Sequence, residues 1–273
     1  MDYKIIASDL DGTLFNTKHR ISEKNLAAIE WLYKNGIYFV PASGRAFNEM
    51  PSILREHPLI RFYISSDGGT VYDKKEDRTY NLTMSRETSN RVLDEFYKYK
   101  INMMLHADVN SYVDLDLHSE EEYKSCNLNR TWIDFVFAND VPKADFKKFA
   151  YSHEAVQVFC TFFADMNDLK ACKKTLDGMD DIIVAQSDEF NLEIVSDKAG
   201  KGNALMLLAD ILGIDRQKTI AVGDSTNDMT MVKMAGLGLA MENAVDKLKA
   251  NADEVICNND SHAIDYIVNR YIK

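Results

Sequence analysis

Short, wholly apolar runs of strand length alternate with helix-like segments at both ends of this chain, and this pattern constrains the fold most. Such runs occupy residues 5–7, 37–40, 62–64 and 219–222. Residues 22–35 have apolar side chains at helical intervals after Ser22, a residue type that caps helices, and residues 47–55 are also expected to be helical. Strands that are apolar on both faces and separated by helices are typical of a parallel sheet covered on both sides. We therefore predict an α/β fold for residues 1–80 and 193–273.

The middle of the chain, residues 81–192, follows a different pattern. Residues 86–99 fit a helix. Longer alternating strands fit residues 102–117, 132–137 and 155–163. Aromatic side chains expected in the core of that sheet are Trp132, Phe135, Phe137, Phe159, Phe162 and Phe163. The chain is thus predicted to be a Rossmann-like parallel-sheet core domain with an inserted α+β cap domain.

Composition and charge exclude several classes of protein. The 273 residues carry 32 Lys and Arg against 43 Asp and Glu, a formal net charge of −11. Nucleic-acid backbones are bound by clustered Lys and Arg, so we expect no nucleic-acid partner. No apolar run approaches the roughly 18 residues of a membrane span, and the first residues lack a signal-peptide pattern. We expect a cytoplasmic enzyme without a membrane partner, and the sequence leaves its oligomeric state open.

Metal sites built on sulfur or imidazole have no support in the sequence. The four cysteines (Cys126, Cys160, Cys172 and Cys257) show no CxxC spacing, which favours free thiols. The six histidines show no paired spacing typical of a metal site.

Carboxylates, by contrast, follow several of the predicted core strands. Asp9 and Asp11 follow the first, Asp67 the third, and Asp224 the strand at 219–222. The ends of parallel strands meet at one edge of the sheet, where ligands bind. Carboxylates gathered there repel one another unless a hard cation lies among them, and oxygen ligands without Cys or His indicate Mg²⁺. Two carboxylates two residues apart also allow one to attack phosphorus while the other transfers protons.

Four motifs resemble those of the haloacid dehalogenase (HAD) superfamily, whose members are mainly Mg²⁺-dependent phosphatases. They are Asp9-Leu10-Asp11-Gly12-Thr13-Leu14, Ser43-Gly44-Arg45, Lys201-Gly202-Asn203-Ala204-Leu205 and Gly223-Asp224-Ser225-Thr226-Asn227-Asp228-Met229. They occur in family order over nearly the whole chain. The insert lies between the second and third motifs, which is similar to the Cof-type subfamily with its α+β cap.

The resemblance implies a role for each matching residue. Asp9 would be the nucleophile and Asp11 the general acid and base. The Mg²⁺ ligands would be Asp9, the backbone carbonyl of Asp11, and Asp224. The phosphate-binding residues would be Leu10, Ser43, Gly44, Lys201 and Asn227. Asp228 would be a supporting carboxylate behind the metal ligands.

Some positions depart from the family pattern or stay open. Asp67 stands where many relatives carry Asn, which adds a negative charge near the site and bears on substrate choice. Lys198 competes with Lys201 for the phosphate, and the spacing to Ala204 and Leu205 favours Lys201. Arg45 has no assigned role.

The function expected from the resemblance is Mg²⁺-dependent hydrolysis of a small phosphorylated metabolite through an aspartyl phosphate on Asp9. A sugar phosphate is the leading candidate, and the cap is expected to close over the site and select the leaving group. Two alternatives remain: a phosphomutase of the same superfamily, and a metabolite-binding regulator without catalysis.

Overall fold

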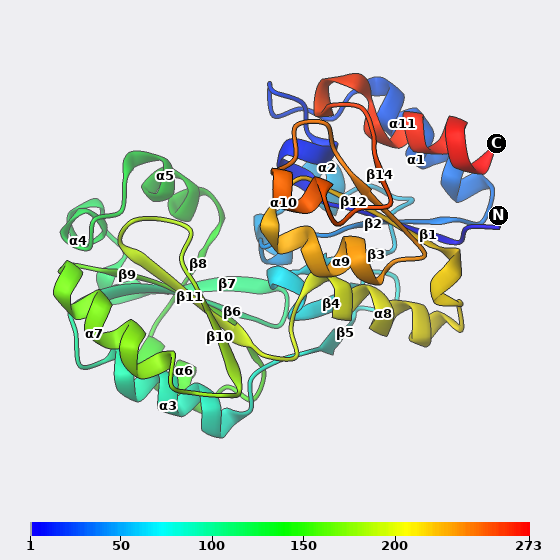
Figure 1. Cartoon of the computed structure of the whole chain (residues 1–273). Helices are drawn as coiled ribbons and strands as arrows, with labels where there is room; N and C mark the ends of the chain where they lie inside the picture. Colours follow the sequence, from blue (N-terminus) through cyan, green and yellow to red (C-terminus); the bar gives the residue numbers. More distant parts are fainter. Residues whose placement is uncertain (1) are drawn as a thin grey trace. The chain divides into compact units, whose positions relative to one another are not determined.

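The chain divides into two units in the computed structural model, which describes residues 2–273 (Figure 1). The core unit contains the chain up to Gly44, Pro51–Tyr80 and Gly200–Lys273. The insert unit contains Arg45–Met50 and Asn81–Ala199. The junction expected between residues 192 and 193 differs, because it falls within β11 (Asn191–Ser196), a strand that pairs with two strands of the insert unit.

A five-stranded parallel sheet forms the centre of the core unit, in the order β14-β13-β12-β1-β2. The strands are β1 (Ile5–Ser8), β2 (Tyr38–Pro41), β12 (Thr219–Gly223), β13 (Leu237–Ala240) and β14 (Glu254–Val255). Every residue of the central strands β1 and β12 is buried. The predicted α/β fold with a parallel-sheet core is thereby confirmed.

Helices cover both faces of this sheet. They are α1 (Glu23–Lys34), α2 (Ser52–Arg55), α8 (Lys201–Leu212), α9 (Met229–Met234), α10 (Asp246–Lys249) and α11 (Ala263–Ile267). Figure 1 shows α1 and α11 on one side and α8 and α9 on the other, and each pair is in contact. The side chain of Ser22 accepts a hydrogen bond from the N–H of Asn25, so the predicted cap of α1 is confirmed.

The helix expected over residues 47–55 is not continuous. A 3-10 turn covers Phe47–Glu49, and α2 begins only after Pro51. Proline has no N–H to donate to the preceding turn, and it restricts the residue before it to extended conformations. The break is also where the chain leaves the insert unit.

A second, antiparallel sheet of the core unit contains β3 (Phe62–Ser65), β4 (Thr70–Asp73) and β5 (Arg78–Asn81). A parallel bridge between Ala42 and Ile64 aligns β3 with the end of β2. The loops that follow β1, β2, β3 and β12 therefore leave from the same edge.

The insert unit is built on a six-stranded sheet in the order β10-β11-β9-β6-β7-β8. The strands other than β11 are β6 (Ile101–Ala107), β7 (Asn110–Asp114), β8 (Val141–Lys143), β9 (Val156–Phe163) and β10 (Ile182–Ala185). The helices are α3 (Arg86–Phe96), α4 (Glu120–Ser125), α5 (Arg130–Asn139), α6 (Phe146–Ser152) and α7 (Met166–Leu176). Buried side chains of α3, α6 and α7 pack on one face of the sheet, and those of α4 and α5 pack on the other.

The strand predicted at residues 132–137 is wrong, because this segment lies within α5. The side chain of Asn129 accepts a hydrogen bond from the N–H of Trp132 and so caps the helix. Phe137, expected in the core, is 46% exposed. Phe159, Phe162 and Phe163 of β9 are fully buried, as predicted.

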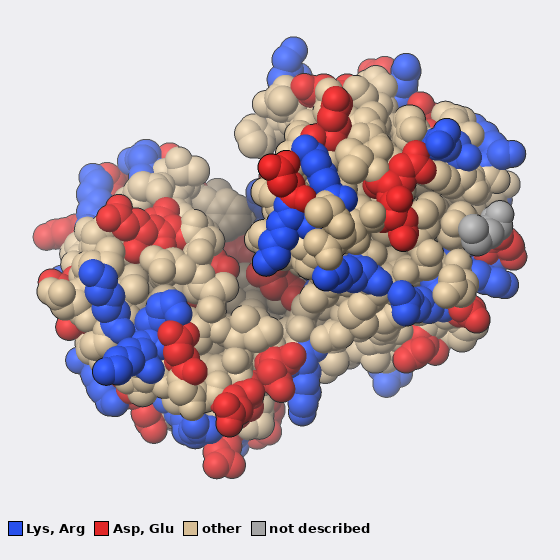
Figure 2. Space-filling view, viewed as in Figure 1, with Lys and Arg blue, Asp and Glu red and all other residues tan. Residues whose placement is uncertain are grey.

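The surface matches the acidic composition. Acidic and basic side chains are interspersed over the face drawn in Figure 2, where the described residues form no continuous basic patch. Within residues 2–273, no helix combines the length and the apolar character needed to cross a membrane. The four cysteines are free, as predicted.

Candidate active site

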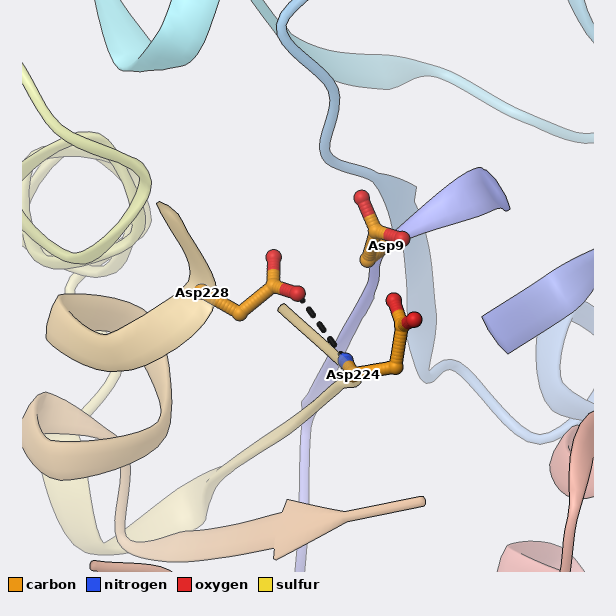
Figure 3. Close-up of side chains that lie close together, drawn as sticks. All are labelled: Asp9, Asp224 and Asp228. Carbon is orange, nitrogen blue, oxygen red and sulfur yellow. Dashed lines mark hydrogen bonds between the residues drawn. The ribbon is translucent and has the colours of Figure 1, made fainter. Parts of the chain in front are cut away.

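Three aspartates of the core unit lie together where its central strands end (Figure 3). Asp9 directly follows β1, Asp224 follows β12, and Asp228 ends the 3-10 turn Thr226–Asp228. One carboxylate oxygen of each lies within 4.8 Å of one oxygen of each of the others. Asp228 is fully buried and Asp9 is 7% exposed. Such a cluster needs positive charge nearby.

Lys201, the first residue of α8, supplies part of that charge. Its Nζ lies 2.6 Å from Oδ1 of Asp9 and 2.7 Å from Oδ1 of Asp228. The side chain is 1% exposed, and a buried ammonium requires such partners. Burial lowers the pKa of this ammonium, but Asp9 and Asp228, and then Asp67, outweigh burial and raise the pKa above its ordinary value. Lys198, the competing candidate, is exposed.

Both carboxylate oxygens of Asp228 accept hydrogen bonds. Oδ1 accepts from Lys201, and Oδ2 accepts from the backbone N–H groups of Asp224 and Ser225, each at 3.0 Å. Figure 3 shows the bond to Asp224, whose own carboxylate points toward that of Asp9. Asp228 therefore holds Lys201 and the Asp224 loop in place and leaves Asp9 and Asp224 to face a ligand.

The electrostatics of the cluster fit a divalent cation. Burial raises the pKa of Asp9 above its usual value, although Lys201 pulls it down. Burial, and then the charge of Asp228, raises the pKa of Asp224 to about 6. Both carboxylates are thus less easily ionised than an exposed aspartate, and a bound cation would reverse this. The donors are oxygens alone, as Mg²⁺ requires.

The turn Leu10–Leu14 places the backbone of Gly12 close to the carboxylate of Asp224. Gly12 has a φ of +79°, and a Cβ there would overlap the carboxylate of Asp224. Asp11 is exposed within this turn, and Leu10 is buried.

Two residues that sequence reasoning missed support this turn. Thr13 donates from Oγ1 to Oδ1 of Asp224 at 3.3 Å. Asn243 donates from Nδ2 to the carbonyl of Gly12 at 2.8 Å. Thr13 is part of the first motif, and that position is a signal that could have indicated its role.

Replacing Gly12 by alanine is expected to reduce activity at least tenfold and to weaken cation binding. The added methyl group would displace Asp224 and strain a left-handed backbone, which costs about 1–2 kcal/mol. Gly36→Ala is the matched control, because Gly36 has a φ of +69° and a Cβ there would meet nothing within 4 Å. Steady-state kinetics and thermal unfolding of both variants check this. Equal activity in the two would contradict the steric explanation.

The predicted phosphate-binding residues after β2 and β12 are linked through Asp67. Ser43 is buried, and its carbonyl accepts from the N–H of Asp67 at 3.1 Å. Asn227 donates from Nδ2 to Oδ1 of Asp67 at 3.2 Å. A Cβ on Gly44 would lie 3.1 Å from both carboxylate oxygens of Asp67. Asp67 therefore brings Ser43, Gly44 and Asn227 together.

Arg45, by contrast, belongs to the insert unit. Its guanidinium carbon lies 5.3 Å from the centre of the Phe135 ring, a cation–π arrangement.

Comparison with known proteins identifies the family of the chain. A family model described as haloacid dehalogenase-like hydrolase matches residues 6–268. The Bacillus subtilis phosphatase YwpJ is 31% identical, with 97% of this chain and 98% of that protein covered. The 5-amino-6-(5-phospho-D-ribitylamino)uracil phosphatase YwtE of Bacillus subtilis is 30% identical, with 98% of each covered. A solved haloacid dehalogenase-like hydrolase from Bacillus subtilis is 28% identical with a TM-score of 0.77, covering 98% of this chain and 100% of that one.

The chain belongs to the haloacid dehalogenase-like hydrolase family. It is a phosphoric monoester hydrolase, because the relatives that it matches over nearly their whole length are phosphatases. The resemblance inferred from the sequence, including the Cof-type subfamily, is confirmed. Cytoplasmic location and the roles of individual site residues stay predictions.

Proposed function

We propose that the protein is a Mg²⁺-dependent phosphatase that hydrolyses a small phosphorylated metabolite through an aspartyl phosphate on Asp9. The observation that carries this proposal is the pairing of Asp9 with the buried ammonium of Lys201, beside Asp224. One Asp9 oxygen is held by Lys201, which fixes the direction of the carboxylate. Positioning and charge stabilisation are most of what phosphoryl transfer requires.

The reaction has two steps. In the first, a carboxylate oxygen of Asp9 forms a bond to phosphorus, the ester P–O bond breaks, and Asp11 gives its proton to the departing alcohol oxygen. In the second, Asp11 takes a proton from water, the water oxygen bonds to phosphorus, and the bond to Asp9 breaks. The products are an alcohol and inorganic phosphate, and both aspartates return to their starting state.

Asp9 and Asp224, with the backbone carbonyl of Asp11, would hold the Mg²⁺. When bound, Mg²⁺ supplies positive charge that offsets the phosphoryl oxygens and the clustered carboxylates. Ser43, the Gly44 amide, Lys201 and Asn227 would bind the phosphoryl oxygens.

The substrate class is a phosphate ester of a polyhydroxy compound, with sugar phosphates first. The relative YwtE is named for a substrate that carries a phosphorylated ribityl chain, which is a polyol. This supports the class and leaves the individual substrate to experiment.

The proposal is tested with p-nitrophenyl phosphate, with and without Mg²⁺, followed by a panel of phosphorylated metabolites. We expect release of inorganic phosphate that depends on Mg²⁺. Conversion of a sugar phosphate to its isomer without free phosphate would identify a phosphomutase. No turnover of any ester, with metabolite binding retained, would identify a regulator.

Removing the divalent cation is expected to abolish activity and to lower the melting temperature. At a Mg²⁺ concentration 100 times its Kd, binding stabilises the native state by about 2.7 kcal/mol. Calorimetry with and without chelator measures this shift. The melting temperature of Asp224→Asn should no longer respond to Mg²⁺, whereas Asp210→Asn, an exposed aspartate of α8, should respond as the wild type does. An unchanged response in Asp224→Asn would remove Asp224 from the metal ligands.

A further inference from the structure

Asp67 is a carboxylate placed among groups proposed to bind a phosphate. It follows β3 in a tight turn in which Ser66, Asp67 and Gly68 have φ values of +53°, +50° and +82°. A Cβ at Gly68 would overlap the backbone of Gly200 and Lys201, so this turn lies directly against the start of α8. The position of Asp67 is thus fixed by the backbone.

Asp67 also fixes the orientation of Asn227. The side-chain oxygen of Asn227 accepts a hydrogen bond from Oγ of Ser225, and its nitrogen donates to Oδ1 of Asp67 at 3.2 Å. The amide is held at both ends and is not free to flip. Because an amide nitrogen carries two N–H groups, one remains for a ligand.

The charge of Asp67 adds to a site that is already acidic. Asp9 and Asp228 pair with Lys201, Asp224 lies beside them, and Asp67 acts on the same ammonium. Its oxygens lie against Gly44, whose amide is proposed to bind phosphate. A phosphate dianion bound there meets repulsion from the half-buried carboxylate of Asp67, whose Oδ1 accepts a hydrogen bond from the neutral amide of Asn227.

We propose that Asp67 is a positioning residue that aims Asn227 at the bound phosphate, and that its negative charge weakens the binding of inorganic phosphate. This inference rests on the proposed function and concerns the same site. The hydrogen bond serves catalysis, because it orders a donor before the substrate arrives. The charge favours departure of the product, which would otherwise remain on the cation and Lys201.

Two variants separate the hydrogen bond from the charge. Asp67→Asn keeps an acceptor oxygen for Asn227 and removes the charge, and Asn tolerates the left-handed backbone. Asp67→Gly removes both without straining the backbone. Asp77→Asn is the control, because Asp77 is an exposed aspartate of the core unit with a φ of +48°.

The measurements are kcat, KM and the inhibition constant of inorganic phosphate, with p-nitrophenyl phosphate as substrate. We expect Asp67→Asn to bind inorganic phosphate about tenfold more tightly than the wild type, which corresponds to about 1.4 kcal/mol. We expect kcat/KM of Asp67→Gly to fall about tenfold below that of Asp67→Asn. Asp77→Asn should match the wild type in all three constants.

The outcomes are decisive in both directions. An inhibition constant for Asp67→Asn within twofold of the wild type overturns the role of the charge. Equal kcat/KM in Asp67→Asn and Asp67→Gly overturns the positioning of Asn227. Thermal unfolding of each variant shows that it is folded. If the wild type releases no phosphate, the proposed function fails instead, and calorimetric titration of wild type and Asp67→Asn with inorganic phosphate and Mg²⁺ still tests the charge.

Discussion

Asp9→Asn is expected to lose at least about 10⁴-fold in kcat, because an amide cannot form the acyl phosphate. Asn has nearly the same size, so the buried position beside Lys201 remains filled. Steady-state release of phosphate from p-nitrophenyl phosphate measures the loss. Asp210→Asn is the control, because it makes the same change at an exposed position on α8 and should retain full activity.

Asp11→Asn should also abolish turnover, but at a different step. With p-nitrophenyl phosphate the first step still proceeds, because p-nitrophenolate leaves as a stable anion that needs no proton from Asp11. Without the base, water is not activated in the second step, so phosphoryl groups remain on Asp9. Mass spectrometry of this variant after incubation with p-nitrophenyl phosphate should find the peptide containing Asp9 heavier by one phosphoryl group. Full activity of Asp9→Asn would contradict the assignment of Asp9 as the nucleophile. Phosphorylation of a different residue in Asp11→Asn would assign that role to the other residue.

Lys201→Met is expected to destabilise the protein by about 3–5 kcal/mol, the usual cost of breaking a buried ion pair. The change removes the ammonium and keeps most of the volume. Asp9 and Asp228 would then face each other without a cation from the chain. Urea unfolding, with chelator present, measures the loss in free energy of unfolding.

Two comparisons make this result specific. Lys24→Met, at an exposed position on α1, should change stability by no more than about 0.5 kcal/mol. Adding Asp228→Asn to Lys201→Met should recover part of the loss, because it removes one of the uncompensated charges. Additive losses in the double variant would show that the pair is not coupled.

The core unit was predictable because its short strands are apolar on both faces and alternate with helices, a pattern typical of covered parallel sheets. The insert was harder to predict. Trp132 and Val136, four positions apart, suit one face of a helix as well as a buried strand, and only Asn129, read as a cap, would have indicated α5. Loss of the helix at Pro51 was foreseeable from proline chemistry.

The candidate site was also predictable only in part. The sequence placed Asp9, Lys201 and Asp224 in one site, and the structure brings them together. The sequence does not reveal that Asp228 shares the ammonium of Lys201 with Asp9, because this depends on how α8 meets the loop after β12. The contact between Asp67 and Asn227 joins residues 160 positions apart and was equally out of reach.

Residues 45–50 have a consequence for engineering. They follow Ser43 and Gly44 directly, yet their bonds are made within the insert unit: Asn48 donates to carbonyls of Val109 and Asn139 and accepts from the N–H of Ser111. Deleting residues 81–199 alone would remove these hydrogen-bond partners and leave residues 45–50 in the truncated protein without them. A chimera that borrows the insert of a relative must therefore transplant both stretches together.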